Sequence, residues 1–155
     1  MTSVSFNDCV VPAGVGRRLG AMVYDGILVL ALWLLVTIIH LAFFRVVLSQ
    51  PAEVVGTSAL AVWSLRGLLL LSTTGFFCFF WRRAGMTLGM QAWRLRVQTL
   101  DGATITLTQG LIRCVVAWLS LALFGLGYWW VFFDCQQRSW PDIASNTRTN
   151  VVTGR

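Results

Sequence analysis

The chain has 155 residues, of which 57% are hydrophobic and 12% are charged, against a charged fraction of about 25% in an ordinary soluble domain. This composition excludes a typical soluble fold and indicates an integral membrane protein. All 12 basic residues are arginine and the formal net charge is +6, but the arginines mostly flank apolar runs, which indicates membrane orientation rather than nucleic-acid binding.

Residues 1–16 predict a flexible lead-in, because glycine and proline stand there among small and polar residues. Arg17 and Arg18 then precede a long apolar run, which predicts a membrane helix over about residues 19–44. The run exceeds the roughly 7 to 15 residues of a signal-peptide core and is interrupted by Asp25. We therefore expect a retained helix rather than a cleaved signal.

Asp25 is the most unusual residue of this first helix, because a carboxylate inside an apolar run is costly unless it faces protein. Arg18 lies seven residues earlier on the same helical face, about 10 Å away along the axis, which is too far for a good intrahelical pair. We therefore expect Asp25 to contact an arginine of another segment. Arg113 is the first candidate for this contact and Arg18 the second.

The second apolar run predicts a helix over about residues 59–81, ending in an aromatic cluster and two arginines that are typical of a membrane interface. A polar loop over residues 82–107 follows. Within it, residues 94–97 alternate polar and apolar, and Asp101-Gly102 is a strong turn signal. The loop therefore predicts a small β-hairpin on the cytoplasmic side.

The third apolar segment, about residues 108–133, is broken by Gly125 and Gly127 and fits either one membrane span or a hairpin that re-enters the bilayer. A single span would put seven arginines on one side of the membrane and four on the other, whereas a hairpin changes the split to ten against one. The stronger bias favours the re-entrant hairpin with both termini cytoplasmic. The hairpin would also bring Asp142 to the face that carries Arg18 and Asp25.

The tail over residues 134–152 predicts one short helical turn, with Pro141 at its start and Asn146 as a left-handed cap at its end. The chain's cysteines show no metal-ligand spacing and are expected to be free thiols. These cysteines are Cys9, Cys78, Cys114 and Cys135.

Five sequence blocks together are similar to the RDD family of bacterial membrane proteins, over roughly residues 14–152. The family is named for one arginine and two aspartates, which fall here on Arg18, Asp25 and Asp142. Two departures stand in the tail, where Pro141 replaces a common His or Gly and Asn146 replaces the usual Gly. The blocks are Arg17-Arg18-Leu-x-Ala-x-x-x-Asp25, Thr87-Leu-Gly89-Met-x-x-x-x-Leu-Arg96-Val, Asp101-Gly102, Arg113 before an apolar stretch, and Arg138-x-x-x-Asp142-x-x-Ser-x-Thr147-x-x-x-Val151-Val152.

The expected fold is an all-α integral membrane protein that forms one domain over residues 17–152, with two full transmembrane helices, a third apolar helical segment and a small β-hairpin. The resemblance places it in the bacterial cytoplasmic membrane, with the lipid bilayer as its surroundings and a homo-oligomer as a possible assembly. No cofactor, metal or nucleic acid is expected.

Two functions remain open at this stage. The first is a structural or accessory membrane protein in which Arg18, Asp25, Arg113 and Asp142 form a charge network. The second, which the resemblance also implies, is a cation/proton antiporter that binds a monovalent cation or a proton at Asp25. An enzyme is not expected, because the sequence has a single histidine, no nucleophile motif and no phosphate-binding loop.

Overall fold

The computed structural model describes residues 11–152, apart from the side chains of residues 11, 52, 54 and 55. These residues divide into two compact units. The helix-pair unit comprises Gly26–Phe76, and the core unit comprises the described residues up to Asp25 and from Phe77 onwards. Each unit is described by itself.

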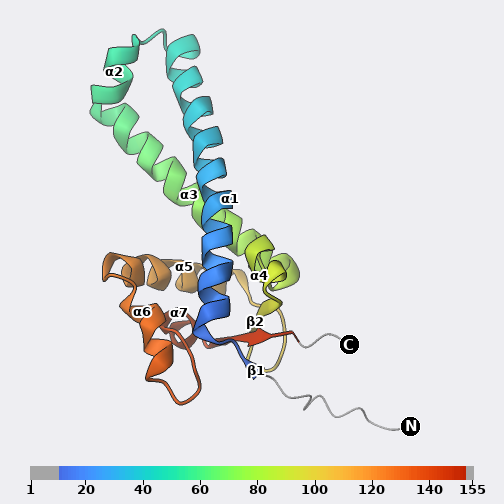
Figure 1. Cartoon of the computed structure of the whole chain (residues 1–155). Helices are drawn as coiled ribbons and strands as arrows, with labels where there is room; N and C mark the ends of the chain where they lie inside the picture. Colours follow the sequence, from blue (N-terminus) through green and yellow to red (C-terminus); the bar gives the residue numbers. More distant parts are fainter. Residues whose placement is uncertain (1–10, 153–155) are drawn as a thin grey trace. The chain divides into compact units, whose positions relative to one another are not determined.

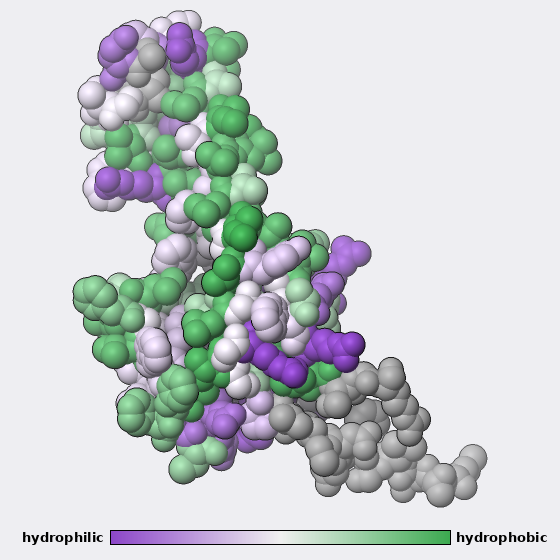
Figure 2. Space-filling model, viewed as in Figure 1, coloured by the Kyte–Doolittle hydropathy of each residue, from purple (hydrophilic) through white to green (hydrophobic). Residues whose placement is uncertain are grey.

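The helix-pair unit contains the larger parts of two helices that are long and apolar enough to cross a membrane, as the sequence predicted, and each helix continues into the core unit. Helix α1 covers Val15–Ala42 and continues as a π-helical turn, η1, over Phe43–Val47, while α3 covers Ala59–Ala84. The short helix α2, Ala52–Thr57, joins them. Hydrophobic residues cover most of the visible surface of the pair, and hydrophilic residues gather at the end where α2 lies (Figure 2).

Two polar contacts connect the paired helices inside this apolar unit. The Trp33 indole N–H donates to the Thr73 hydroxyl at 2.8 Å, and His40 Nε2 lies 2.9 Å from the Ser64 hydroxyl. His40 also packs on Phe44, with the two ring centroids 4.7 Å apart. These contacts satisfy polar groups that would be costly to leave unpaired in a lipid environment.

The core unit contains a three-stranded antiparallel sheet whose order is β1-β3-β2. Strand β1 is Val11–Pro12, β2 is Leu95–Thr99 and β3 is Thr147–Val151. The last strand of the chain therefore lies in the middle of the sheet (Figure 1). Residues 11–16 of the expected lead-in carry secondary structure, since they contain β1 and the start of α1. Residues 1–10 of the expected lead-in lie outside the described residues.

The predicted β-hairpin in the polar loop is wrong in its second strand. The turn at Asp101-Gly102 is present, with the Gly102 N–H donating to the Thr99 carbonyl at 3.0 Å. Residues 103–106 form no strand, however, because Thr106 and Gln109 make a capping box that starts helix α5, Leu107–Ala122. Strand β2 pairs with the tail strand β3 instead.

The third apolar segment is two helices rather than one straight span. Helix α5 is followed by α6, Leu126–Trp129, and by a short 3₁₀ turn, η2, over Trp130–Phe132, with a bend of 106° between the two parts. Gly125 at the bend has a φ angle of 77°, which glycine adopts without a steric cost. Phe124 beside it also has a positive φ angle, of 55°. The turn near Gly125 and Gly127, one of the two arrangements that the sequence allowed, is therefore present as a bend.

Two short helices complete the core unit, namely α4 over Leu88–Ala92 and α7 over Trp140–Ala144. The left-handed conformation predicted for Asn146 after α7 is confirmed, with a φ of 53°. Cys78, Cys114 and Cys135 are free thiols, as expected. Cys9 lies outside the described residues.

Gly127 tests how closely α6 packs against α5. A Cβ atom at this position would lie 2.6 Å from the Ser120 hydroxyl and 3.0 Å from Trp140 Cδ2. We expect Gly127→Ala to destabilise the chain by about 1 to 3 kcal/mol through overpacking, seen as a lower midpoint of thermal unfolding in a neutral detergent. Gly16→Ala is the control, because a Cβ there meets nothing within 4 Å. Equal midpoints for the two variants would contradict this packing.

Candidate functional site

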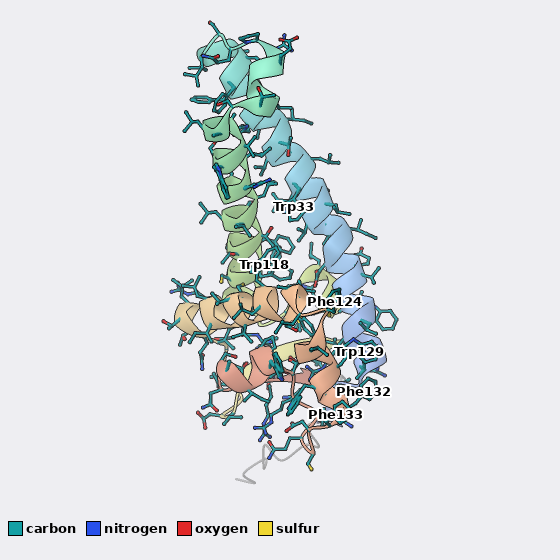
Figure 3. The ribbon with its side chains drawn as sticks, turned by 90° about the vertical axis from the view of Figure 1, so that its left-hand side faces the viewer. Trp33, Trp118, Phe124, Trp129, Phe132 and Phe133 are labelled. Atoms are coloured by element: carbon teal, nitrogen blue, oxygen red, sulfur yellow. The ribbon has the colours of Figure 1, made fainter. Side chains whose placement is uncertain are left out.

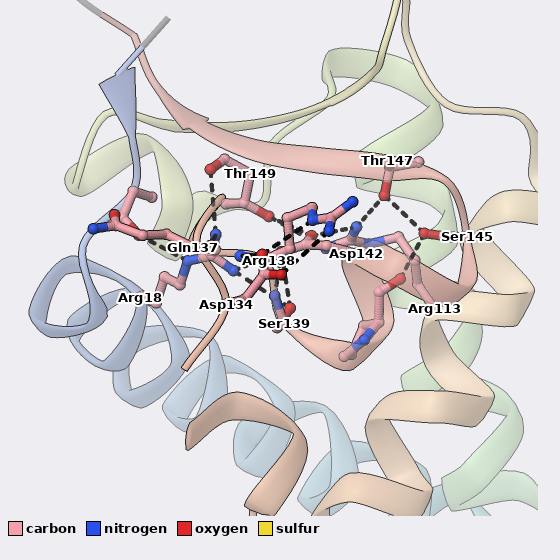
Figure 4. Close-up of polar contacts among 12 residues, drawn as sticks. Arg18, Arg113, Asp134, Gln137, Arg138, Ser139, Asp142, Ser145, Thr147 and Thr149 are labelled. Atoms are coloured by element: carbon pink, nitrogen blue, oxygen red, sulfur yellow. Dashed lines mark hydrogen bonds and ion pairs between the residues drawn. The ribbon is translucent and has the colours of Figure 1, made fainter. Parts of the chain in front are cut away.

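The candidate site is a buried charge network centred on Asp142 in the first turn of α7. The Asp142 side chain is fully buried, and Arg18 and Arg113 are 9% and 5% exposed. One carboxylate oxygen accepts from Arg18 at 2.6 Å and the other accepts from Arg113 at 2.7 Å. A single carboxylate thus bridges two guanidinium groups (Figure 4).

Local capping geometry holds the Asp142 carboxylate in place. Ser139 precedes α7, and its backbone N–H and hydroxyl donate to the same Asp142 oxygen at 3.1 and 2.8 Å. Asp142 is three positions after Ser139, which is the spacing of a capping box, and its carboxylate also lies near the positive end of the helix. The Ser139–Asp142 spacing is therefore a usable sequence signal for this helix start, although the prediction for the tail did not include it.

The tail strand β3 supplies the remaining walls of the network. Thr147 and Thr149 are buried and lie two residues apart, so both face the same side of the strand. The Thr149 hydroxyl donates to Asp142 at 2.8 Å, and the Thr147 hydroxyl accepts from Arg113. Strand alternation therefore places two hydroxyl groups where the charged side chains meet.

Arg18 also binds the backbone of three separate segments. Its guanidinium donates to the carbonyl oxygens of Ala13 at 3.0 Å, Gln137 at 3.0 Å and Thr149 at 3.4 Å. An arginine has five N–H donors in a fixed fork and can therefore connect several acceptors at once. Arg18 thus ties the start of α1 to the tail.

Arg113 contacts an aromatic ring in addition to Asp142 and the hydroxyl groups of Thr147 and Thr149. Its guanidinium carbon lies 5.1 Å from the centre of the Trp81 ring, a cation–π contact. Arg113 projects from α5 and Trp81 from the last turns of α3. The network therefore connects α1, α3, α5, α7 and β3 within the core unit.

The electrostatic balance of the network keeps Asp142 ionised. Burial would raise the pKa of the Asp142 carboxyl, but the guanidinium groups of Arg113 and Arg18 outweigh burial and hold its pKa well below the ordinary value of 3.8. Two positive charges against one negative charge leave the network with a formal excess of +1. Backbone carbonyls and the Trp81 ring face part of that excess.

Asp25 does not join the network, and the expectation that it pairs with Arg113 or Arg18 is wrong. Its carboxylate accepts from the Thr87 hydroxyl and from the Gly89 backbone N–H, the latter at 2.9 Å. In the described part of the chain, Asp25 has no ion pair. The free donors at the start of α4 satisfy the carboxylate without a cation, which is the physical reason for the difference.

The Thr87–Gly89 segment lets Asp25 of α1 reach the start of α4. The Thr87 hydroxyl caps α4 by accepting from the Met90 N–H at 3.2 Å, and its own proton goes to Asp25. A Cβ atom at Gly89 would lie 2.8 Å from the Asp25 carboxyl carbon and would also meet the Ala21 carbonyl oxygen. Glycine at this position lets α1 approach the α4 backbone.

Within residues 11–152, the other predicted residues lie outside the Asp142 network and make no hydrogen bond or ion pair with Asp25. Arg138 forms an ion pair with Asp134 at 3.0 Å, and hydrogen bonds from Arg138 lower the pKa of the Asp134 carboxyl. Asp101 and Gly102 are exposed at the turn after β2. Arg17 is exposed in the first turn of α1.

The fold and the site define a helical membrane protein with two candidate spans and a tail held by a buried Arg–Asp–Arg network. A model of the RDD family matches residues 12–146. The chain belongs to the RDD family. A search of curated proteins and a search of solved structures returned no match.

Substitution of Asp142 should destabilise the chain more than loss of one arginine. Asp142→Asn leaves two buried guanidinium groups without a counter-charge, for which we expect a cost of about 3 to 5 kcal/mol. Arg113→Gln leaves the neutral Arg18–Asp142 pair and should cost less. Thermal unfolding midpoints in neutral detergent at pH 7 measure the order, and a smaller effect for Asp142→Asn would contradict it.

The same carboxylate predicts a pH dependence. Because the folded-state pKa of Asp142 is lowered, its stabilising contribution is complete above the ordinary value of 3.8 and is lost as the pH falls from there towards the folded-state pKa. The difference in unfolding midpoint between the native chain and Asp142→Asn should therefore narrow below about pH 4. A difference that stays constant between pH 7 and pH 3 would count against a charged Asp142.

Proposed function

We propose that this protein is a structural or accessory component of the membrane, rather than an enzyme, in which the Arg18–Asp142–Arg113 network holds the tail on the start of α1. The observation behind this proposal is that both carboxylate oxygens of Asp142 already accept hydrogen bonds. One of its oxygens accepts from Arg18 and Ser139, and the other from Arg113 and Thr149. No oxygen is left to exchange a cation, and the lowered pKa keeps the group from exchanging a proton near neutral pH.

The membrane placement that we propose has two spans, α1 and α3, and a third element, α5 to η2, that re-enters the bilayer without crossing it. Large apolar side chains on this element and directly after it are exposed, with Phe124 at the bend 95% and Phe133 after η2 79% exposed. Figure 3 shows Phe124 at the bend, Trp129 and Phe132 along α6 and η2, and Phe133 directly after η2. The sharp bend and the arginine distribution support this placement.

Both termini are cytoplasmic in this proposal, and the membrane is the bacterial cytoplasmic membrane. We also propose that the chain forms a homo-oligomer. Most of each apolar window of α1 and α3 is uncovered in the monomer, so helices of a second copy can pack there as readily as lipid.

The orientation of the tail can be measured directly. A fluorescent protein fused after Arg155 should fold and emit in whole cells, whereas an alkaline phosphatase fused at the same position should be inactive. Fusions in the connection between α1 and α3, at Gln50, are the matched control and should give the opposite result. An active phosphatase at Arg155 would contradict the re-entrant element.

A cation/proton exchanger is the second candidate, because Asp25 differs from Asp142 in one relevant respect. Asp25 is 4% exposed, and the donors that it accepts from, the Thr87 hydroxyl and the Gly89 N–H, are neutral. A carboxylate without a fixed counter-charge can lose or gain a proton or cation at a lower electrostatic cost than a bridged one. An exchanger would therefore work through Asp25.

Ion flux separates the two functions. We expect proteoliposomes of the purified chain at high protein density to show no uptake of sodium or lithium when a pH gradient is imposed. Empty liposomes and liposomes with Asp25→Asn provide the two baselines. Uptake by the native chain that Asp25→Asn abolishes would replace the structural proposal with the exchanger.

A further inference from the structure

The core unit contains a cavity that is lined neither by the Asp142 network nor by Asp25. It has a volume of about 420 Å³ and opens between the first turn of α1, the end of α4 and the end of β3. Two of its lining residues are arginines, none is acidic, and the others are apolar or aromatic. The lining residues are Arg17, Ala92, Trp93, Arg94, Val151 and Val152.

Arg17 and Arg94 are the charged walls of this cavity. In the part of the chain that the structure describes, neither side chain has a hydrogen bond or an ion pair, unlike Arg18, Arg113 and Arg138. Two like charges around one hollow repel each other and create a positive potential that concentrates anions. The cavity therefore favours an anionic ligand.

The backbone at Arg94 has a left-handed conformation that two hydrogen bonds hold in place. Arg94 has a φ of 54°, a left-handed conformation that is uncommon for a residue with a branched or long side chain. Two backbone hydrogen bonds hold it, from Arg94 N to Gln91 O at 3.1 Å and from Val152 N to Arg94 O at 2.7 Å. The chain thus keeps an arginine at the rim of the cavity where glycine would be less strained.

Trp93 is the aromatic wall, and its position is set by a glycine of α1. A Cβ atom at Gly20 would lie 2.9 Å from the Trp93 indole nitrogen, so the ring packs directly on the α1 backbone, three residues after Arg17. Val151 and Val152 supply apolar surface on the β3 side. A ligand with a charged group and an adjoining apolar part would match both kinds of wall.

We propose that this cavity binds a phosphate group, supplied either by the headgroup of an anionic phospholipid or by free phosphate. Arginine recognises phosphate oxygens through paired N–H donors, and two guanidinium groups match the one or two negative charges that a phosphate bears. The tryptophan and the two valines suit the start of the acyl chains next to the headgroup, and tryptophan is enriched at membrane interfaces. Arg17 lies nine positions before the uncharged run of residues 26–44, which is the position of an interfacial arginine at the end of a membrane helix.

The test measures lipid binding to the full chain in a neutral detergent by native mass spectrometry. Phosphatidylglycerol is titrated against the native chain, Arg17→Gln/Arg94→Gln and the control Arg82→Gln/Arg83→Gln. The control removes the same charge from two exposed arginines that do not line the cavity. We expect the cavity variant to bind at least about tenfold more weakly and the control to stay within about twofold of the native chain.

Two further arms separate the sources of the phosphate. Diacylglycerol carries the same chains without phosphate and should bind the native chain much more weakly than phosphatidylglycerol does. Inorganic phosphate that displaces the lipid from the native chain identifies free phosphate as a ligand, whereas no displacement identifies the lipid headgroup. Either result supports the phosphate site.

Arg94→Gly keeps the test decisive if the double variant fails to fold. Glycine adopts the left-handed conformation of this position without strain, so the variant loses the guanidinium but not the turn. It should retain the native unfolding midpoint and bind phosphatidylglycerol several-fold more weakly. Equal weakening of the cavity and control variants, or equal binding of diacylglycerol and phosphatidylglycerol, would overturn the proposal.

Discussion

The Asp142 carboxylate is the contact on which the rest of the core unit depends. It is fully buried, and it binds Arg18 of α1 and Arg113 of α5 at the same time. The two arginines bring further segments with them, since Arg18 binds three backbone carbonyls and Arg113 lies on the Trp81 ring. One negative charge thus determines where the tail returns to the first helix. Such a bridge is costly to break because each guanidinium is already removed from water.

Asp25 and Asp142 are both buried, but different groups compensate their carboxylates. Asp142 is compensated by opposite charges, whereas Asp25 is compensated by a hydroxyl and a backbone N–H at the start of α4. The first arrangement fixes the ionised form of the group. The second keeps a carboxylate in place without a cation beside it. This contrast explains why the structural proposal rests on Asp142 and the exchanger alternative on Asp25.

The predicted β-hairpin after β2 is absent because a helix begins where its second strand was expected. Asp101-Gly102 forms its turn, but the capping box of Thr106 and Gln109 begins a helix where a second strand was expected. Strand β2 then finds its partner in β3, about 50 positions further along the chain. Local turn chemistry was readable at this position. The partner of strand β2 was not, because strand pairing depends on tertiary contacts more than on local propensity.

The sequence by itself determined the membrane class, the two long apolar helices and the left-handed turn at Asn146, and it offered a turn at Gly125 and Gly127 as one of two arrangements of the third segment. Each of these depends on residues close together in the chain, through periodicity, run length or backbone preference. Tertiary structure alone decided which arginines Asp142 binds, that Asp25 binds Thr87 and Gly89, and that the tail strand is central in the sheet. Those pairings join distant positions, such as Val11 with Val151 in the sheet and Arg18 with Asp142 in the network, and charge alone does not choose among twelve arginines and five aspartates.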